Sequence, residues 1–143
     1  MSEQEVITRS PAGTRRLARR LAAKLPPRCV LALHGDLGSG KTCFVQGLGE
    51  ALGIDQPVTS PTFTLVHEYR GPRTLYHIDL YRIRSADEAL ALGLEDYLDP
   101  DGITVIEWAE RAGELLPGDT VHLHFEVLPG KSRRRIRVVR SSG

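Results

Sequence analysis

The sequence predicts an α/β domain in which helices flank a mixed sheet that includes antiparallel hairpins. The apolar run at 29–35 leads directly into a glycine-rich stretch, and a helical pattern follows from Lys41. A second apolar run lies at 103–108, and two pairs of strand-like segments are each separated by a short turn. Continuous apolar runs are typical of strands buried on both faces of a parallel sheet, whereas turn-linked pairs favour antiparallel hairpins.

Length and composition limit the class of protein. We expect residues 1–143 to form one domain, because a chain of 143 residues can bury a single core. The sequence is 41% hydrophobic and 26% charged, and its formal net charge of +1 argues against coating nucleic acid through an overall field. No window approaches the roughly 20 apolar residues of a membrane span. Cys29 and Cys43 lack the spacing of a zinc site or disulfide framework. We therefore expect a cytoplasmic protein without membrane segments.

The segment before the first apolar run is predicted to form a short strand at 6–9 and then a helix. Ser10 can cap this helix and Pro11 takes its first position, where a proline needs no N–H donor. The helix should run to about Leu25, because two prolines follow it. Its outer face is strongly basic, with Arg15, Arg16, Arg19, Arg20 and Lys24.

Helical and strand patterns continue after the glycine-rich stretch. The spacing predicts a helix over 41–52, with Gly53 as a C-terminal stop. A short helix is expected at 86–92. The apolar strand at 103–108 should be followed by a helix of about two turns that ends near Leu116, before a proline and a glycine.

Two hairpins are predicted from turn signals between β-like runs. The first joins 64–70 to 74–82 through Gly71 and Pro72. The second joins 121–128 to 133–139 through the turn residues PGKS.

The glycine-rich stretch GDLGSGKT satisfies the phosphate-loop pattern G-x-x-x-x-G-K-[ST] in full. Glycines let backbone N–H groups close around phosphate oxygens, while the lysine supplies a charge for the β- and γ-phosphates and the threonine hydroxyl can bind magnesium. A plain turn that caps a helix would need neither of those side chains. The residues expected to hold a magnesium-bound nucleotide are Gly35, Asp36, Leu37, Gly38, Ser39, Gly40, Lys41 and Thr42.

Two acids end apolar strands and are candidates for the chemistry beside the loop. Glu107 closes the run ITVI, where a carboxylate can serve the magnesium ion, and Asp79 closes LYHI, where it can act as a general base. Either acid could instead cap a following helix or pair with an arginine such as Arg82 or Arg111. For Asp79 these alternatives stay open.

Thr62 lies in SPTF, between the helix after the phosphate loop and the first hairpin. Loops in this position sense the γ-phosphate or magnesium in other phosphate-loop proteins. Local hydrogen bonds from Ser60 and Thr62 to the backbone explain the same residues without a function.

Four motifs occur together, namely GDLGSGKT, SPTFTLV, HIDLYR and IEWAER, and their order and separation resemble the bacterial TsaE family, also called YjeE-like. The resemblance implies an ATPase of tRNA threonylcarbamoyladenosine biosynthesis that uses ATP and Mg²⁺ and acts with the TsaB and TsaD heterodimer. By motif, Thr42 and Glu107 resemble the magnesium ligands, Asp79 an acid needed for hydrolysis, and Thr62 the switch threonine. Trp108 resembles the family tryptophan beside the metal acid.

Other functions would also fit parts of the sequence. A small-molecule kinase shares the phosphate loop but usually has an arginine-bearing lid, which we do not identify here. A GTPase switch is disfavoured because the D-x-x-G match at 99–102 precedes a strand and no N-K-x-D is present to read guanine. A nucleotide-dependent scaffold that turns over only with its partners is the third alternative.

Basic and histidine residues leave two further questions open. The turn and strand of the second hairpin could contact tRNA, nucleotide phosphates or an acidic partner surface, through Lys131, Arg133, Arg134, Arg135 and Arg137. His122 and His124 point the same way along a strand, but neither a carboxylate nor a cysteine joins them or His67 and His77 at ligand spacing. We expect these four histidines to pack in the ordinary way.

Overall fold

The computed structural model describes residues 2–36, 38–59, 61, 66–130 and 132–140. Within these residues seven strands form one sheet in the order β1-β7-β6-β2-β5-β4-β3. The elements are β1 (Ser2–Thr8), α1 (Pro11–Ala22), β2 (Cys29–His34), α2 (Lys41–Ala51), β3 (Val66–Tyr69), β4 (Leu75–Asp79), α3 (Ala86–Ala91), the 3-10 helix η1 (Leu94–Tyr97), β5 (Ile103–Glu107), the 3-10 helix η2 (Ala109–Leu115), β6 (Val121–Val127) and β7 (Arg134–Arg140).

The sheet is mixed, as predicted. β2 pairs in parallel with β5 on one side and β6 on the other, and β4 pairs in parallel with β5. β3 pairs antiparallel with β4, and β7 pairs antiparallel with β6, which confirms both hairpins. β1 pairs antiparallel with β7 and forms one edge of the sheet, while β3 forms the opposite edge. The four parallel strands β2, β4, β5 and β6 therefore end at the same edge of the sheet.

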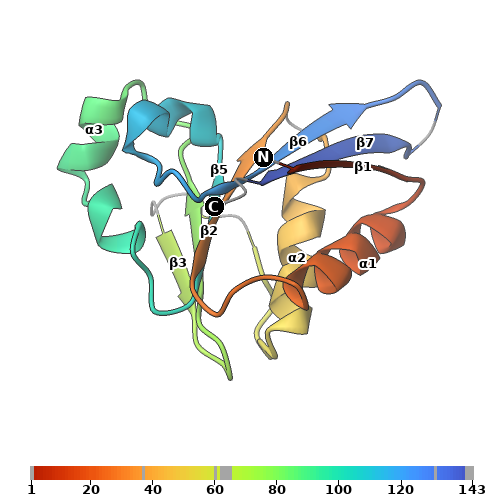
Figure 1. Ribbon diagram of the computed structural model, residues 1–143, viewed down its shortest axis with the longest axis horizontal. Coiled ribbons are helices and arrows are strands. Elements are labelled where there is room, and N and C mark those ends of the chain that lie inside the picture. The colour runs from red at the N-terminus through yellow and green to blue at the C-terminus, as the bar shows by residue number, and fades with distance from the viewer. Residues whose placement is uncertain (1, 37, 60, 62–65, 131, 141–143) are drawn as a thin grey trace.

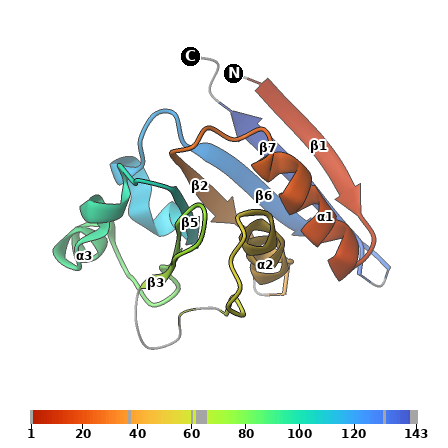
Figure 2. The ribbon, with the colours of Figure 1, turned by 90° about the horizontal axis from the view of Figure 1, so that it is seen from below.

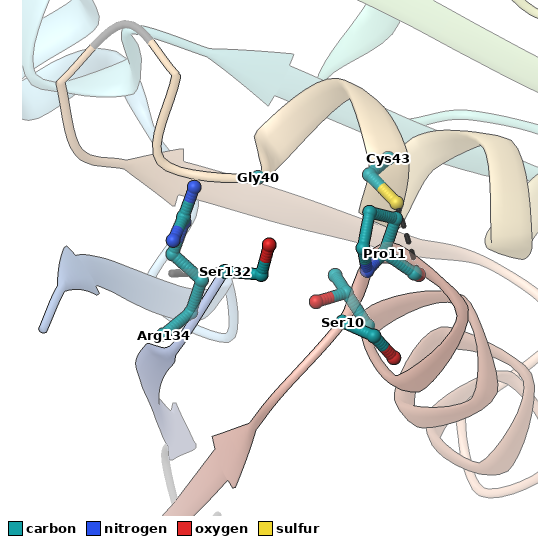
Figure 3. A pocket seen from close by; sticks show the side chains of 7 residues that line it. Ser10, Pro11, Gly40, Cys43, Ser132 and Arg134 are labelled. Carbon is teal, nitrogen blue, oxygen red and sulfur yellow. Dashed lines mark hydrogen bonds between the residues drawn. The ribbon is translucent and has the colours of Figure 1, made fainter. Parts of the chain in front are cut away.

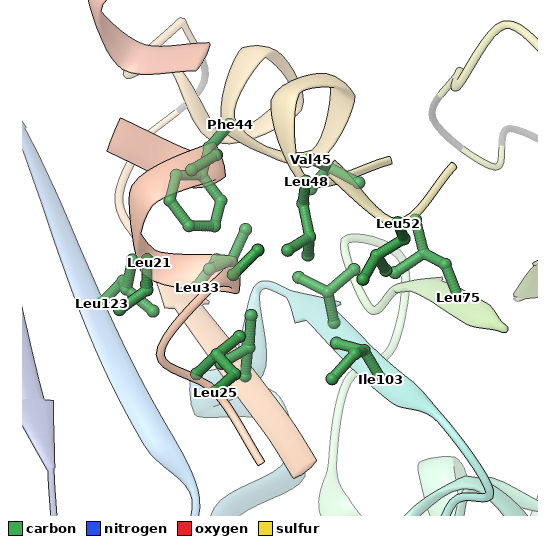
Figure 4. Packing of buried hydrophobic residues seen from close by; sticks show 14 of the residues in the cluster. Leu21, Leu25, Leu33, Phe44, Val45, Leu48, Leu52, Leu75, Ile103 and Leu123 are labelled. Atoms are coloured by element: carbon green, nitrogen blue, oxygen red, sulfur yellow. The ribbon is translucent and has the colours of Figure 1, made fainter. Parts of the chain in front are cut away.

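Helices cover both faces of the sheet, and each face has its own core. α1 and α2 lie side by side over one face, whereas α3 and the two 3-10 helices lie over the other (Figure 1, Figure 2). The larger core joins α1 and α2 to the strands, and Figure 4 shows Phe44, Leu48 and Leu33 meeting within it. The smaller core packs Ile78 and Ile106 of the sheet against the α3 side.

The first helix begins as predicted and ends earlier. Ser10 has extended backbone angles, and its Oγ accepts a hydrogen bond of 3.0 Å from Gly13 N. The helix ends at Ala22, three residues before the expected Leu25, and its last turn tightens through a bond of 3.3 Å from Leu25 N to Ala22 O. Leu25 precedes a proline, and residues in that position are disfavoured in the helical region.

Three further elements differ from the sequence-based predictions. The two-turn helix expected after β5 is instead η2, a pair of 3-10 turns joined at Gly113, whose φ of 57° and ψ of −129° are not helical. β1 begins at Ser2 rather than residue 6, because its pairing with β7 extends the strand beyond its apolar part. The 3-10 helix η1 had not been predicted. Among the described helices, none combines the length and apolar character that crossing a bilayer requires.

The two helices beside the larger core touch through bare backbone at Gly47. A Cβ atom added there would lie 2.6 Å from Arg15 O and 2.7 Å from Arg15 Cα. Carbon atoms do not approach backbone so closely, so any side chain at Gly47 has to push α1 away from α2. This glycine therefore sets the spacing of the two helices.

We expect Gly47→Ala to lower the free energy of unfolding by about 1–3 kcal/mol, the usual cost of overpacking a core. Urea unfolding of the variant and the parent protein measures this difference. Gly118→Ala is the matched control, because a Cβ at Gly118 meets no atom within 4 Å. Equal stability of Gly47→Ala and the parent would show that α1 can move at no cost.

Candidate nucleotide-binding site

The described residues of the glycine-rich stretch lie between the end of β2 and the start of α2, as the motif predicts. Gly35, Gly38 and Gly40 have φ values of 146°, 78° and 105°, a region that side chains disfavour. A Cβ at Gly35 would also lie 2.7 Å from Phe125 O on β6. Gly40 caps α2, whose first residues are Lys41 and Thr42. Strand, loop and helix N-terminus together form the geometry that binds phosphate.

Lys41 is the cation of the loop. Its side chain is buried, with 4% of the residue exposed, and its Nζ donates to Gly35 O at 2.5 Å. The same nitrogen lies 3.9 Å from the ring centroid of Trp108. Burial lowers the pKa of Lys41, while the nearby carboxylates of Glu107 and others act in the opposite direction.

The two acids predicted from strand ends lie next to each other. Asp79 and Glu107 are paired positions on β4 and β5, and Leu33 of β2 is paired with Glu107 on the other side. Glu107 is 4% exposed and faces the loop. A cavity of about 230 Å³ lies between the acid and the loop, lined by Gly38, Gly40, Lys41, Thr42, Cys43 and Glu107. The fold therefore brings the predicted lysine, threonine and glutamate to one cavity.

A buried histidine that sequence reasoning did not assign to the site holds Glu107. His77 is fully buried, and its Nε2 lies 2.5 Å from Glu107 Oε2. Its Nδ1 is a buried atom without a hydrogen-bond partner among the described residues. The signal was present, because His77 and Asp79 are two residues apart on one strand and so share a face. Glu107 thus pairs with a histidine rather than with Arg82 or Arg111.

The structure shows a local hydrogen bond at Asp79, whereas its role as a general base stays a prediction. Its Oδ1 accepts a hydrogen bond of 2.9 Å from Tyr81 N, so it caps the turn after β4. It also lies beside Glu107 at the edge where the loop lies. Burial raises the pKa of Asp79, and the charge of Glu107 acts in the same direction, while the bond from Tyr81 opposes it.

Comparison with known proteins agrees with this geometry. Residues 8–136 match the family described as "Threonylcarbamoyl adenosine biosynthesis protein TsaE". The chain belongs to the TsaE family. It is 41% identical over 127 residues to the tRNA threonylcarbamoyladenosine biosynthesis protein TsaE of Treponema pallidum, covering 89% of this chain and 94% of that protein. It is 44% identical over 124 residues to the protein of the same name from Bacillus subtilis, covering 86% and 77%.

A solved structure supports the fold assignment for this TsaE-family chain. The crystal structure of YdiB from Bacillus subtilis matches it with a TM-score of 0.82 at 34% sequence identity, covering 97% of this chain and 86% of that chain. The phosphate-loop NTPase fold predicted from the sequence is therefore confirmed.

The HIDLYR and IEWAER motifs of the family pack against each other behind the acids. Arg111 donates to Ile83 O at 3.0 Å and also to Tyr81 O. Its guanidinium lies 5.3 Å from the ring of Trp108, and the rings of Tyr81 and Trp108 are 5.2 Å apart. These contacts join the turn after β4 to the turn after β5, and so fix Trp108 beside Lys41.

Two residues of the predicted site, Leu37 and Thr62, lie outside the described residues. The switch role of Thr62 therefore stays a prediction. Pro61, its neighbour in SPTF, is buried.

Three histidines stack on the neighbouring strands β2 and β6. His34 lies 4.6 Å from His124 between ring centroids, and its Nε2 lies 2.9 Å from His122 Nδ1. The sequence analysis placed no carboxylate at ligand spacing from His122 or His124 and did not consider His34, whose Nδ1 lies 3.2 Å from Glu110 Oε2. Burial lowers the pKa of His122 and of His124, and His34 acts in the same direction. Among the described residues, no such group has an arrangement suited to a metal ion.

We expect Asp79→Asn to raise the free energy of unfolding at neutral pH, because asparagine keeps the Oδ1 acceptor for Tyr81 N and removes the buried charge. The folded-state pKa of Asp79 is raised above its ordinary value of 3.8. Such a carboxyl stabilises the folded state at low pH, and this contribution is lost as the pH rises from the ordinary value through the raised one. The gain from Asp79→Asn should therefore grow over that interval.

Denaturant unfolding at a series of pH values measures this difference, with Asp55→Asn at an exposed carboxyl as the control. A gain that is independent of pH would contradict the assignment of a raised pKa to Asp79.

Proposed function

We propose that this TsaE-family chain binds ATP with Mg²⁺ and hydrolyses it during threonylcarbamoyl modification of the adenosine next to the anticodon in tRNA. The observation that carries this proposal is the convergence of Lys41, Thr42 and Glu107 on one cavity of about 230 Å³ at the end of β2. The relatives from Treponema pallidum and Bacillus subtilis are both tRNA threonylcarbamoyladenosine biosynthesis proteins, which supports the pathway.

The residues at the cavity fit a magnesium nucleotide. Magnesium prefers oxygen ligands, and the Thr42 hydroxyl and the Glu107 carboxylate are oxygen donors that both line the cavity. His77 contacts Glu107 Oε2 and so would orient the carboxylate that would hold the ion. When bound, Mg²⁺ supplies positive charge to the β- and γ-phosphates.

The chain's own groups would supply binding, orientation and proton transfer. Loop N–H groups and the α2 N-terminus hold the phosphates, and Lys41 adds a charge confined by Gly35 O and Trp108. Asp79 would accept a proton from the attacking water, because its raised pKa makes the carboxylate a stronger base. The bond from Tyr81 to Asp79 Oδ1 fixes its orientation.

The proposed partners are TsaB and TsaD, with tRNA contacted indirectly or through the basic edge of the second hairpin. Membership of the TsaE family favours this role over the small-molecule kinase and the GTPase, which the phosphate loop alone would also allow. A nucleotide-dependent scaffold would also associate with its partners in an ATP-dependent way. It differs from the proposed ATPase only in hydrolysing ATP solely when the partners are bound.

We expect Glu107→Ala to lower ATP hydrolysis by at least about 100-fold while weakening nucleotide binding much less, because the loop amides remain. Isothermal titration calorimetry with ATP and Mg²⁺, together with a phosphate-release assay, separates the two effects. Glu114→Ala, an exposed glutamate on η2, is the matched control. Turnover like that of the parent protein in Glu107→Ala would remove Glu107 from the mechanism, and no affinity of the parent for ATP or ADP would overturn the proposed function.

We expect the TsaB and TsaD heterodimer to bind this chain more tightly when ATP and Mg²⁺ are present. A pull-down with purified components, run with ATP, with ADP and without nucleotide, measures the association. Lys41→Ala should remove the dependence on nucleotide, since the loop loses its cation. Identical binding in all three conditions would contradict the proposal.

A further inference from the structure

Three histidines meet on the face of the sheet opposite Glu107, at the strand that leads into the phosphate loop. His34 ends β2, and His122 and His124 lie on β6, where His124 is the register partner of His34. Leu33, the residue before His34, is paired with Glu107 on β5. Because side chains alternate between faces along a strand, the histidine cluster lies on the other face of the sheet from the proposed magnesium ligand.

The two strands that carry the cluster also support the start of the phosphate loop. Gly35 follows His34 directly, and a Cβ atom at Gly35 would lie 2.7 Å from the backbone oxygen of Phe125, the residue after His124. The end of β6 therefore packs against the backbone of the loop itself. Arg134 of the second hairpin contacts the loop farther along its length (Figure 3). A movement of β6 away from β2 at the histidines would thus displace the first residue of the loop.

Hydrogen bonds limit how many protons the cluster can hold. His34 Nε2 lies 2.9 Å from His122 Nδ1, and His34 Nδ1 lies 3.2 Å from Glu110 Oε2 on η2. An ionised carboxylate only accepts, so His34 Nδ1 carries a hydrogen, and of the two facing imidazole nitrogens one must donate and the other accept. The two rings therefore fit this geometry when they are both neutral or when one of them is charged. With both rings protonated, two N–H groups would point at each other.

A second positive charge in the cluster would also meet the first at close range. A charge on His34 faces the carboxylate of Glu110. A second charge on His124 or on His122 would lie 4.6 or 5.2 Å from His34 between ring centroids. Burial lowers the pKa of His122 and of His124, and His34 acts in the same direction. The stack therefore resists the second proton.

Charged groups on β7 and β1 face the same stack. Arg137 is the register partner of His124 and lowers its pKa, whereas Glu3 raises it. Arg137 and Glu3 pair with each other at 3.2 Å, so they act on His124 in opposite directions from one place. Among the described residues, these two and Glu110 are the charged groups that the packed elements turn toward the three histidines.

We propose that His34, His122 and His124 form a proton-sensitive clamp at the base of the phosphate loop, which releases the loop when the cluster takes up a second proton. The inference rests on the proposed function, since a released loop binds phosphate less well. With no charge or one charge, the clamp holds β6 against β2 and Gly35 against Phe125. With two charges it loses the bond between His34 and His122 and its rings repel each other, so the affinity for nucleotide falls as the medium becomes acidic.

Calorimetry with ATP and Mg²⁺ at about pH 7.5 and about pH 5.5 tests the clamp, because this interval spans the titration of histidine. The test protein is the double variant His122→Asn, His124→Asn, whose amides can still donate and accept hydrogen bonds but do not titrate. The ATP affinity of the parent should fall at least about fivefold more over this interval than that of the double variant, since one unit of pKa corresponds to about a tenfold change in a linked equilibrium. Titration of ATP itself and of the acids at the cavity is common to both proteins and cancels in this comparison.

His67→Asn is the matched control, because His67 lies on β3 outside the cluster and this variant should keep the pH dependence of the parent. An equal fall in affinity for the parent and the double variant overturns the clamp and leaves the proposed function standing. Absence of ATP binding by the parent at about pH 7.5 overturns both.

Unfolding by urea gives a second measurement that needs no nucleotide. The folded-state pKa values of His122 and His124 lie below the ordinary value of 6.5, so between those values the folded protein binds fewer protons than the unfolded chain. The stability that the neutral rings allow is therefore present above that ordinary value and is lost as the pH falls through the interval below it. The urea midpoint of the parent should fall with pH more steeply than that of the single variant His122→Asn, with His67→Asn again behaving as the parent. Parallel midpoints for His122→Asn and the parent would contradict the clamp.

Discussion

The parallel alignment of β2 with β5, and of β5 with β4, is the constraint on which the site depends. Because these strands run in the same direction, the loop after β2, the acid at the end of β5 and the acid at the end of β4 reach the same edge. The pairing of Leu33 with Glu107 and of Glu107 with Asp79 fixes their order across the sheet. A shift of register by one residue would turn Glu107 to the opposite face, toward the smaller core.

Ionisable side chains are buried together at this edge of the sheet. Lys41, His77 and Glu107 are buried, and Asp79 lies half-buried beside them. Taking charged groups out of water is unfavourable, and each one here is matched by a specific contact: Lys41 with Gly35 O, Glu107 with His77, and Asp79 with Tyr81 N. The arrangement opposes folding locally, which is usual where a protein keeps groups ready for chemistry. The apolar cores on both faces of the sheet supply the compensating stability.

Local signals explain which parts of the structure could be predicted. The phosphate loop, the strand before it and the helix after it are encoded by residues within about 25 positions of each other. The local sequence motif was therefore sufficient to predict all three. Glu107 and Asp79 were recognised because each ends an apolar run. What the sequence did not reveal depends on contacts between distant segments. The bond between His77 and Glu107, the contact of Glu110 with His34 and that of Arg134 with Gly38 all join separate elements. The kink at Gly113, which replaces the expected helix by two 3-10 turns, needs a glycine conformation that composition alone does not specify.

The pairing of β1 with β7 bears on how the chain reaches this structure during synthesis. Ser2 is opposite Arg140 and Thr8 opposite Arg134, so β1 is synthesised well before its partner β7. Pairing between such distant segments is slow to form, and until it does an unpaired strand edge stays exposed. The same late hairpin supplies Arg134 to the loop. The nascent chain can therefore form α2 early, but that side of the loop is completed only when β7 docks.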